Sequence, residues 1–205
     1  MVNGQIRQNE HAKAGFGPLS RQQIAASLRR TPPELDASDP GLRPAAVLLP
    51  IVERSEPHAL FTRRTEDLPS HAGQICFPGG RYHPDDDTLI QTALREMEEE
   101  IGLSPDKVEI AGFLDSYETL NTRFIILPVV GYLRPGFELL INPREVAEVF
   151  EAPLSYILDP KNQVFKSVER DGVLREFYAI EYGSHTIWGA TAAMIVNLSE
   201  RLGLR

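Results

Sequence analysis

Three glutamates on one face of a predicted helix are the residues of this chain best suited to chemistry. Glu96, Glu99 and Glu100 are separated by three, four and one positions, within a segment that we expect to be helical from about residue 85 to 101. At about 100° per residue, Glu99 and Glu100 fall near 300° and 40° when Glu96 is set to zero. Carboxylates this close repel one another, and a hard divalent cation removes the repulsion. The spacing therefore indicates a site for Mg²⁺ or Mn²⁺, which in turn binds phosphate groups.

The position of the acidic stripe distinguishes it from an ordinary charged surface. The apolar side chains of the helix fall beside it, between about 60° and 160°: Ile90, Ala93, Leu94, Met97 and Ile101. Glu98 points further round, toward solvent. The simple alternative is a solvated face in which Arg95 pairs with Glu99. Two flanking features favour a site: the helix stops at Gly102, and residues 78–80, Pro-Gly-Gly, break the chain just upstream and leave backbone N–H groups for a phosphate.

Composition sets the class of protein. The 205 residues are 42% hydrophobic and 24% charged, which is typical of a globular domain. The net charge of −8 argues against a nucleic-acid partner. Cys76 is the only cysteine, which excludes an intramolecular disulfide and a cysteine-rich zinc site and fits a reducing, cytoplasmic setting. The first residues do not have the pattern of a secretory signal. No apolar run reaches the roughly 18 residues that a membrane-spanning helix needs.

The order of predicted elements indicates an α+β fold. Residues 1–44 are expected to form an N-terminal extension with a short helix over 20–30 and a proline-rich linker over 31–43. The domain proper then spans 45–205. Strands are predicted at 45–52, 58–64, 74–77, 108–117, 124–133 and 146–150, followed by a helical turn at 153–158. A hairpin at 164–170 and 174–182 turns at Asp171-Gly172, and a helix at 187–202 closes the chain. A mixed sheet with helices on its faces accommodates this order.

The segment Gly80–Leu103, GRYHPDDDTLIQTALREMEEEIGL, resembles the Nudix box. The second half of the box is complete, from Arg95-Glu96 to Gly102-Leu103. In the first half, six residues separate Gly80 from Asp87, which stands where glutamate is usual. The coenzyme A pyrophosphatase branch of the family shows similar spacing. The preceding segment, LFTRRTEDLPSHAGQICFPGG, is similar to a motif of that branch. The matching residues are Leu60, Thr62, Arg64, Gly73, Phe77, Pro78, Gly79 and Gly80. The sequence departs from the branch at Thr65 and Pro69, and at His83 within the box. Residues 142–154 and 187–192 resemble later segments.

This resemblance implies a fold, a reaction and roles for residues. The fold is the Nudix α/β/α sandwich around a mixed sheet. Glu96, Glu99 and Glu100 would bind Mg²⁺ or Mn²⁺, and Glu99 and Glu100 would also serve catalysis, with Arg95 orienting a glutamate. The metal would polarise a water that splits coenzyme A into adenosine 3′,5′-bisphosphate and 4′-phosphopantetheine. Phosphate would be bound through residues before and within the box: Arg64, Gly79, Gly80 and Arg81. Since Arg63 and Arg64 alternate on a strand, only one of them faces the site.

The general base is left open by the sequence. Nudix enzymes often take it from a loop beyond the box, where Glu145 and Glu148 are candidates; Glu118 is a third. We expect His71 and His83 to be surface or packing residues, Cys76 to be buried, and Trp188 to begin the last helix against the core.

Two other functions also remain open, as does a homodimer. One is a Nudix pyrophosphohydrolase for another nucleoside diphosphate derivative. The other is a non-catalytic module that binds a nucleotide, against which the three intact glutamates argue.

Overall fold

The computed structural model describes residues 17, 19–35, 41–119, 122–170 and 172–205. The main sheet contains β1 (Arg43–Val52), β2 (His58–Arg64), β3 (Ile75–Cys76), β4 (Gly79–Arg81), β5 (Val108–Phe113), β6 (Tyr117–Glu118), β7 (Phe124–Leu133) and β8 (Val146–Pro153). A second sheet contains β9 (Val164–Arg170), β10 (Val173–Tyr182) and β11 (His185–Trp188). The helices are α1 (Arg21–Ser27), α2 (Leu89–Ile101), α3 (Leu154–Ile157) and α4 (Gly189–Arg201), with short 3₁₀ turns at Pro105–Lys107 and Pro160–Asn162.

The main sheet is mixed, as predicted. Strands β1 and β7 run parallel along their whole length, from Arg43 opposite Phe124 to Val52 opposite Leu133. The other pairs of this sheet are antiparallel. Both parallel strands are nearly continuous apolar runs, which is the pattern of strands buried on two faces. The central strands therefore require a layer of helix on each side.

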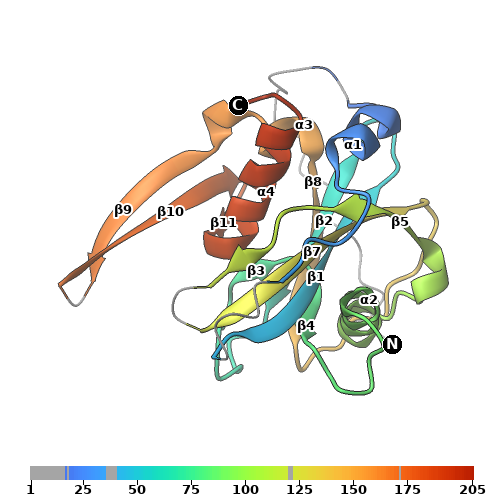
Figure 1. Cartoon of the computed structure of the whole chain (residues 1–205), viewed down its shortest axis with the longest axis horizontal. Coiled ribbons are helices and arrows are strands. Elements are labelled where there is room, and N and C mark those ends of the chain that lie inside the picture. Colours follow the sequence, from blue (N-terminus) through green and yellow to red (C-terminus); the bar gives the residue numbers. More distant parts are fainter. Residues whose placement is uncertain (1–16, 18, 36–40, 120–121, 171) are drawn as a thin grey trace.

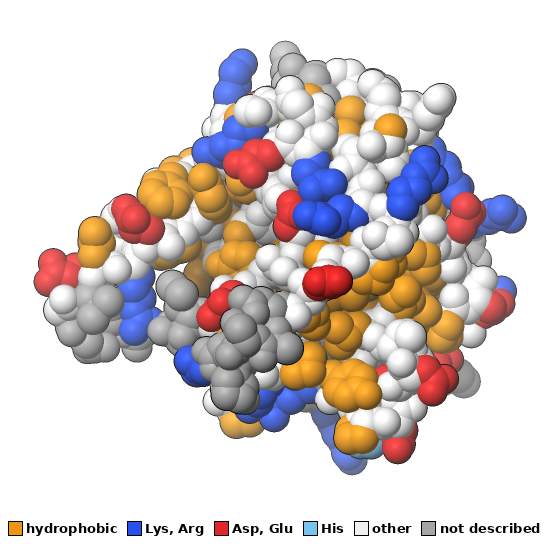
Figure 2. Space-filling model, in the orientation of Figure 1, with side chains coloured by type: hydrophobic (Ala, Val, Ile, Leu, Met, Phe, Trp, Pro, Cys, Tyr) orange, Lys and Arg blue, Asp and Glu red, His pale blue; other side chains and the backbone are white. Residues whose placement is uncertain are grey.

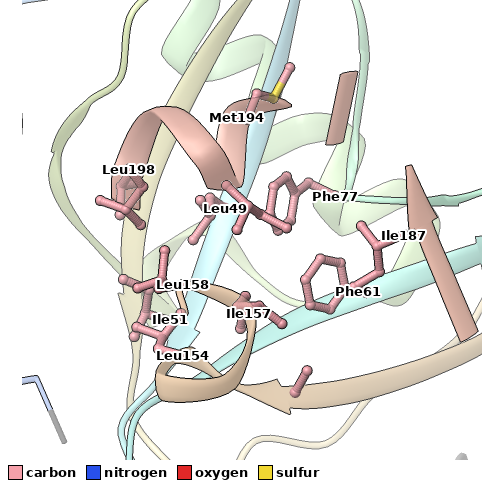
Figure 3. Close-up of a cluster of buried hydrophobic side chains, with 14 of the residues drawn as sticks. Leu49, Ile51, Phe61, Phe77, Leu154, Ile157, Leu158, Ile187, Met194 and Leu198 are labelled. Carbon is pink, nitrogen blue, oxygen red and sulfur yellow. The ribbon is translucent and has the colours of Figure 1, made fainter. Parts of the chain in front are cut away.

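Two hydrophobic clusters lie on opposite faces of this sheet. Figure 1 shows α2 on one side of the sheet and α4 on the other. On one face, helices α1, α3 and α4 cover side chains of β1, β2 and β8. Figure 3 shows the centre of this cluster, where Phe61 lies beside Ile157 and Phe77 lies beside Leu49. On the other face, α2 covers the second cluster through Ala93, Met97 and Ile101. The α+β sandwich expected from the sequence is thus confirmed.

Local signals fix both ends of α2. The Thr88 hydroxyl accepts a hydrogen bond from the backbone N–H of Gln91 and caps the N-terminus. Gly102 ends the helix in the left-handed conformation, with φ of 69°. The end agrees with the prediction, whereas the predicted start at residues 85–87 was wrong: these aspartates precede the helix because Thr88 provides the cap.

Other boundaries differ from the predictions for identifiable reasons. The first helix is shorter than residues 20–30, because Arg29 leaves it to bridge to Phe113. The strand expected at 108–117 is interrupted, because Asp115 is drawn out of the sheet by Arg29 and Arg201. Residues His185–Trp188 form β11 against β10, so the final helix begins at Gly189 and not at 187. The predicted hairpin is confirmed; Asp171 of its turn lies outside the described residues.

The hairpin extends from the body as an arm, on the left of Figure 1. Most of the large hydrophobic side chains that are exposed in the described ranges lie on it or on β11, and Figure 2 shows hydrophobic groups gathered on this arm: Val164, Phe165, Val168, Leu174 and Trp188. The exposed position of Trp188, which packs beside Phe177, contradicts its predicted place against the core. No helix in the described ranges is long and apolar enough to cross a membrane.

The end of α2 supplies a test of the fold. At Gly102 an added Cβ would lie 2.6 Å from the Leu140 Cβ, in a backbone conformation that disfavours side chains. We expect Gly102→Ala to lower the free energy of unfolding by more than about 1 kcal/mol in urea denaturation. Gly203 has the same φ of 69° but open space around it, so Gly203→Ala is the control for the backbone cost alone. Equal losses in the two variants would contradict the close packing of Gly102 on Leu140.

Candidate active site

The three glutamates differ strongly in exposure along α2. The side chain of Glu100 is 2% exposed, that of Glu96 18% and that of Glu99 54%. Glu98 lies on the exposed side, as predicted. The stripe therefore runs from a buried carboxylate into solvent, at the border of the core face of α2.

Two glycines bring the main sheet against this stripe. Gly79 and Gly80 begin β4, which pairs with β1 at Val47 and Ala46. A side chain at Gly80 would collide with the carboxylate of Glu96, and one at Gly79 would collide with the backbone of β1. The residues 78–80, predicted to break the chain, thus continue into a short strand. Glycine is needed here because the strand lies tightly between β1 and α2.

Arg95 connects the exposed part of the stripe to the rest of the site. Its guanidinium donates hydrogen bonds to Glu96 at 2.9 Å and to Glu99 at 3.2 Å. It also donates to the carbonyl oxygen of Arg81 at 3.2 Å, which ties α2 to β4. The structure therefore gives Arg95 the contacts that an orienting residue requires.

Asp86 is the partner that sequence reasoning missed. Its carboxylate accepts two hydrogen bonds from Arg95, at 2.9 and 3.0 Å, and one from the Thr92 hydroxyl at 2.8 Å. The Arg95 guanidinium holds the pKa of the Asp86 carboxyl well below its usual range. Asp87, which the resemblance to the Nudix box placed where glutamate is usual, is exposed. The sequence spacing could have identified Asp86, because five residues separate it from Gly80, which is the usual interval in the first half of the Nudix box.

The buried end of the stripe collects Arg64, Glu100 and Glu145. The Nη1 atom of Arg64 lies 3.7 Å from Oε1 of Glu100. Burial raises the pKa of Glu100 to about 8; the Arg64 charge opposes the shift, and the charges of Glu96 and Glu145 add to it. Among the described side chains, Glu100 Oε2 and Arg64 Nε are buried polar atoms without a hydrogen-bond partner. These atoms are free to receive ligands.

Arg63 and Arg64 face opposite sides of the sheet, as their alternation predicts. Arg63 pairs with Glu148 at 3.0 Å, and Glu148 lies 3.4 Å from His185 on the side of β11. Arg64 is the one that reaches the glutamates.

Of the three candidate bases, Glu145 lies beside the stripe. It is half-buried before β8, where Asn142 donates to its side chain at 3.0 Å and Thr65 donates to its carbonyl. Its charge raises the pKa of both Glu96 and Glu100. Glu148 is instead engaged by Arg63 on the opposite face, and Glu118 is exposed on β6.

The other side chains considered for a role at the site, two histidines, the cysteine and Arg81, make their contacts with residues other than the three glutamates. His71 bonds to Gln74 at 2.8 Å, and His83 is exposed and lies 3.4 Å from Asp85. Burial raises the pKa of the Cys76 thiol to about 11, which leaves it protonated at neutral pH. The guanidinium of Arg81 lies 5.2 Å from the ring centre of Phe124, on the solvent side.

The donor set fits a hard divalent cation. The groups at the stripe are carboxylates, and one oxygen of the buried Glu100 has no partner. Burial raises the pKa of Glu96 as well, so two carboxylates here are destabilised in their charged form and would be stabilised by a cation. In the ranges that the structure describes, no three acidic, histidine or cysteine groups are already arranged as a metal cage. Glu96 and Glu99 both accept hydrogen bonds from Arg95.

Comparison with known proteins decides the family. Residues 41–168 match the model of the NUDIX domain. The chain belongs to the Nudix family. It is 42% identical over 175 residues to a protein named uncharacterized Nudix hydrolase NudL from Photorhabdus laumondii, covering 85% of this chain and 92% of that one. A Yersinia enterocolitica protein of the same name is 41% identical, covering 78% and 82%. The crystal structure of a MutT/nudix family protein from Enterococcus faecalis aligns with a TM-score of 0.50 at 14% identity, over 85% of this chain and 65% of that one.

These findings make the chain a Nudix pyrophosphohydrolase. Nudix hydrolases generally use divalent metal ions such as Mg²⁺ or Mn²⁺. The glutamates of α2 and the Gly79–Gly80 strand lie within the matched residues.

The ion pair between Asp86 and Arg95 should contribute to both stability and turnover. Asp86→Asn leaves Arg95 without its main counter-charge and frees it to shift from Glu96 and Glu99. We expect a loss of about 2–3 kcal/mol in the free energy of unfolding, together with a lower kcat. Asp87→Asn, one residue along and exposed, is the control and should change stability by less than about 0.5 kcal/mol. A larger loss of stability in Asp87→Asn than in Asp86→Asn would show that Asp87, as first predicted, takes the acidic position of the box.

The burial of Glu100 should make the stability of the metal-free protein depend on pH. Its ordinary pKa is 4.5 and its folded pKa is about 8, so the unfolded chain loses this proton first as pH rises. In metal-free protein, this carboxyl therefore lowers stability progressively between about pH 4.5 and 8. With a chelator present, we expect the Tm of Glu100→Gln relative to the unaltered protein to rise from pH 5 to pH 8.5. A difference in Tm that is independent of pH would contradict the burial of a charged Glu100.

Proposed function

We propose that this Nudix enzyme hydrolyses the diphosphate bond of coenzyme A or its derivatives with Mg²⁺ or Mn²⁺, giving adenosine 3′,5′-bisphosphate and 4′-phosphopantetheine. The observation that carries the proposal is the meeting of two motifs. Arg64, from the segment that resembles the coenzyme A branch, lies 3.7 Å from Glu100 of the Nudix box. Gly79 and Gly80, from the same segment, lie against Glu100 and Glu96.

The residues divide the work on a diphosphate between them. We assign Glu96, Glu99 and Glu100 to the metal, which when bound activates water and offsets charge on the phosphoryl oxygens. Arg64 stands at the buried end, where its unpartnered Nε suits a phosphoryl oxygen. The backbone of Gly79–Arg81 borders the stripe on the sheet side. These contacts would hold the diphosphate along α2.

We assign the general base to Glu145. A water oxygen attacks one phosphorus, the bond from that phosphorus to the bridging oxygen breaks, and Glu145 takes the proton released by the water. The bridging oxygen stays with the other phosphate, so both products are phosphomonoesters. Arg95 keeps Glu96 and Glu99 in place, and Asp86 keeps Arg95 in place. Glu145 suits this role because it lies at the buried end of the stripe and outside α2.

A substrate panel tests the proposal. The protein is incubated with Mg²⁺ or Mn²⁺ and coenzyme A, ADP-ribose, NADH or nucleoside triphosphates, and the products are identified by mass. We expect coenzyme A to be cleaved with the highest kcat/KM and to yield the two products named above. Preference for a compound without pantetheine would exclude the coenzyme A assignment, and cleavage of none would contradict the enzymatic reading of the site.

A further inference from the structure

The chain that leads to Glu145 is attached to the end of α2. The last carbonyl groups of a helix have no partner within the helix. In α2 the carbonyl of Glu100 accepts a hydrogen bond from the backbone N–H of Asn142 at 2.9 Å, and that of Ile101 accepts one from Leu140 at 2.9 Å. The segment that carries Glu145 is therefore joined to the glutamate stripe at Glu100 itself.

The side chain of Asn142 reaches the Glu145 carboxylate. Its Nδ2 donates to Oε1 of Glu145 at 3.0 Å, and its Oδ1 accepts from the backbone N–H of Arg144 at 3.2 Å. The reversed amide would set N–H against N–H and oxygen against oxygen, so these two partners fix its orientation. The Asn142 carbonyl also accepts from the backbone N–H groups of Glu145 and Val146, at 3.1 and 2.9 Å. Asn142 therefore holds Glu145 both by its backbone and by its carboxylate.

Thr65, just after β2, holds the same segment from the other side. Its backbone N–H donates to the Glu145 carbonyl at 3.0 Å, and its hydroxyl donates to the Arg144 carbonyl at 3.1 Å. Both contacts bind backbone oxygens and leave the side chain of Glu145 free to rotate. The direction of the Glu145 carboxylate is therefore set by the amide of Asn142.

We propose that Asn142 is a positioning residue that holds the Glu145 carboxylate at a fixed place relative to Glu100. This inference rests on the proposed function, in which Glu145 takes the proton released by the attacking water. A general base must lie within hydrogen-bond reach of that proton, whereas a free glutamate side chain samples several rotamers. With Oε1 held by Asn142, Oε2 is the atom that accepts the proton. Asn142 itself neither gains nor loses a proton.

Substitution of Asn142 tests this role. Asn142→Asp keeps the backbone contacts and the acceptor for Arg144, but it puts an oxygen against the Glu145 carboxylate in place of the N–H donor. Asn142→Ala removes the amide without adding charge. We expect kcat to fall by about tenfold or more in both variants, because a catalytic group displaced by about 1 Å can lose about 100-fold in rate. In Asn142→Ala, KM should change less than kcat. An unchanged kcat in both variants would overturn the proposal.

Asn197→Asp is the matched control. On α4, the half-buried Asn197 also donates from Nδ2 to a carboxylate, that of Asp115, at 2.9 Å, and its Oδ1 also accepts a backbone N–H, at 3.2 Å. The same substitution should therefore lower stability in a similar way, but kcat of the folded protein should be unchanged. An equal fall in kcat in Asn197→Asp and Asn142→Asp would show a general loss of structure and contradict the positioning role.

A double-mutant cycle with coenzyme A separates this inference from the proposed function. Asn142→Ala should add little to Glu145→Gln, because the group that Asn142 positions is then no longer a base. If Glu145→Gln lowers kcat and Asn142→Ala lowers it by its full factor in that background, the general base stands and the positioning role is wrong. If Glu145→Gln leaves kcat unchanged, the general base is wrong and the positioning role with it. If coenzyme A is not cleaved and the non-additive cycle appears with another nucleoside diphosphate derivative, the proposed substrate is wrong and the positioning role stands.

Discussion

Repulsion between carboxylates at the border of a hydrophobic core is the constraint on which this site depends. Glu100 is almost fully buried, and the charges of Glu96 and Glu145 add to the cost of ionising it. Left alone, such a cluster would take up protons or open to water. The protein limits the cost with one arginine at each end, Arg64 beside Glu100 and Arg95 beside Glu96. What remains is an excess of negative charge that a divalent cation is suited to neutralise.

The fold keeps this cluster in place from two sides. Helix α2 is fixed at one end by the Thr88 cap and at the other by Gly102 against Leu140. The short strand β4 fits between β1 and α2 because Gly79 and Gly80 have no side chains. Arg95 joins the two elements, and Asp86 fixes Arg95. Together these contacts keep the carboxylates of Glu96, Glu99 and Glu100 close to one another despite their mutual repulsion.

Much of the site follows from the sequence because it depends on local periodicity. Helical spacing put Glu96, Glu99 and Glu100 on one face and Glu98 on another, and strand alternation separated Arg63 from Arg64. What sequence could not supply depends on contacts between distant segments. Three consecutive aspartates look alike until burial selects Asp86. The pairing of Gly79–Arg81 with β1 and the strand His185–Trp188 both require the folded sheet.

The most direct test of the account is the dependence of turnover on the Glu100 carboxylate. Glu100→Gln keeps the size and packing of the side chain and removes the charge that would bind the metal. With saturating Mg²⁺ or Mn²⁺, we expect kcat for the best substrate to fall by orders of magnitude while the circular dichroism spectrum is unchanged. Mn²⁺ affinity, followed by electron paramagnetic resonance, should fall as well. Near-normal turnover and Mn²⁺ binding in this variant would contradict a metal site on the glutamate stripe.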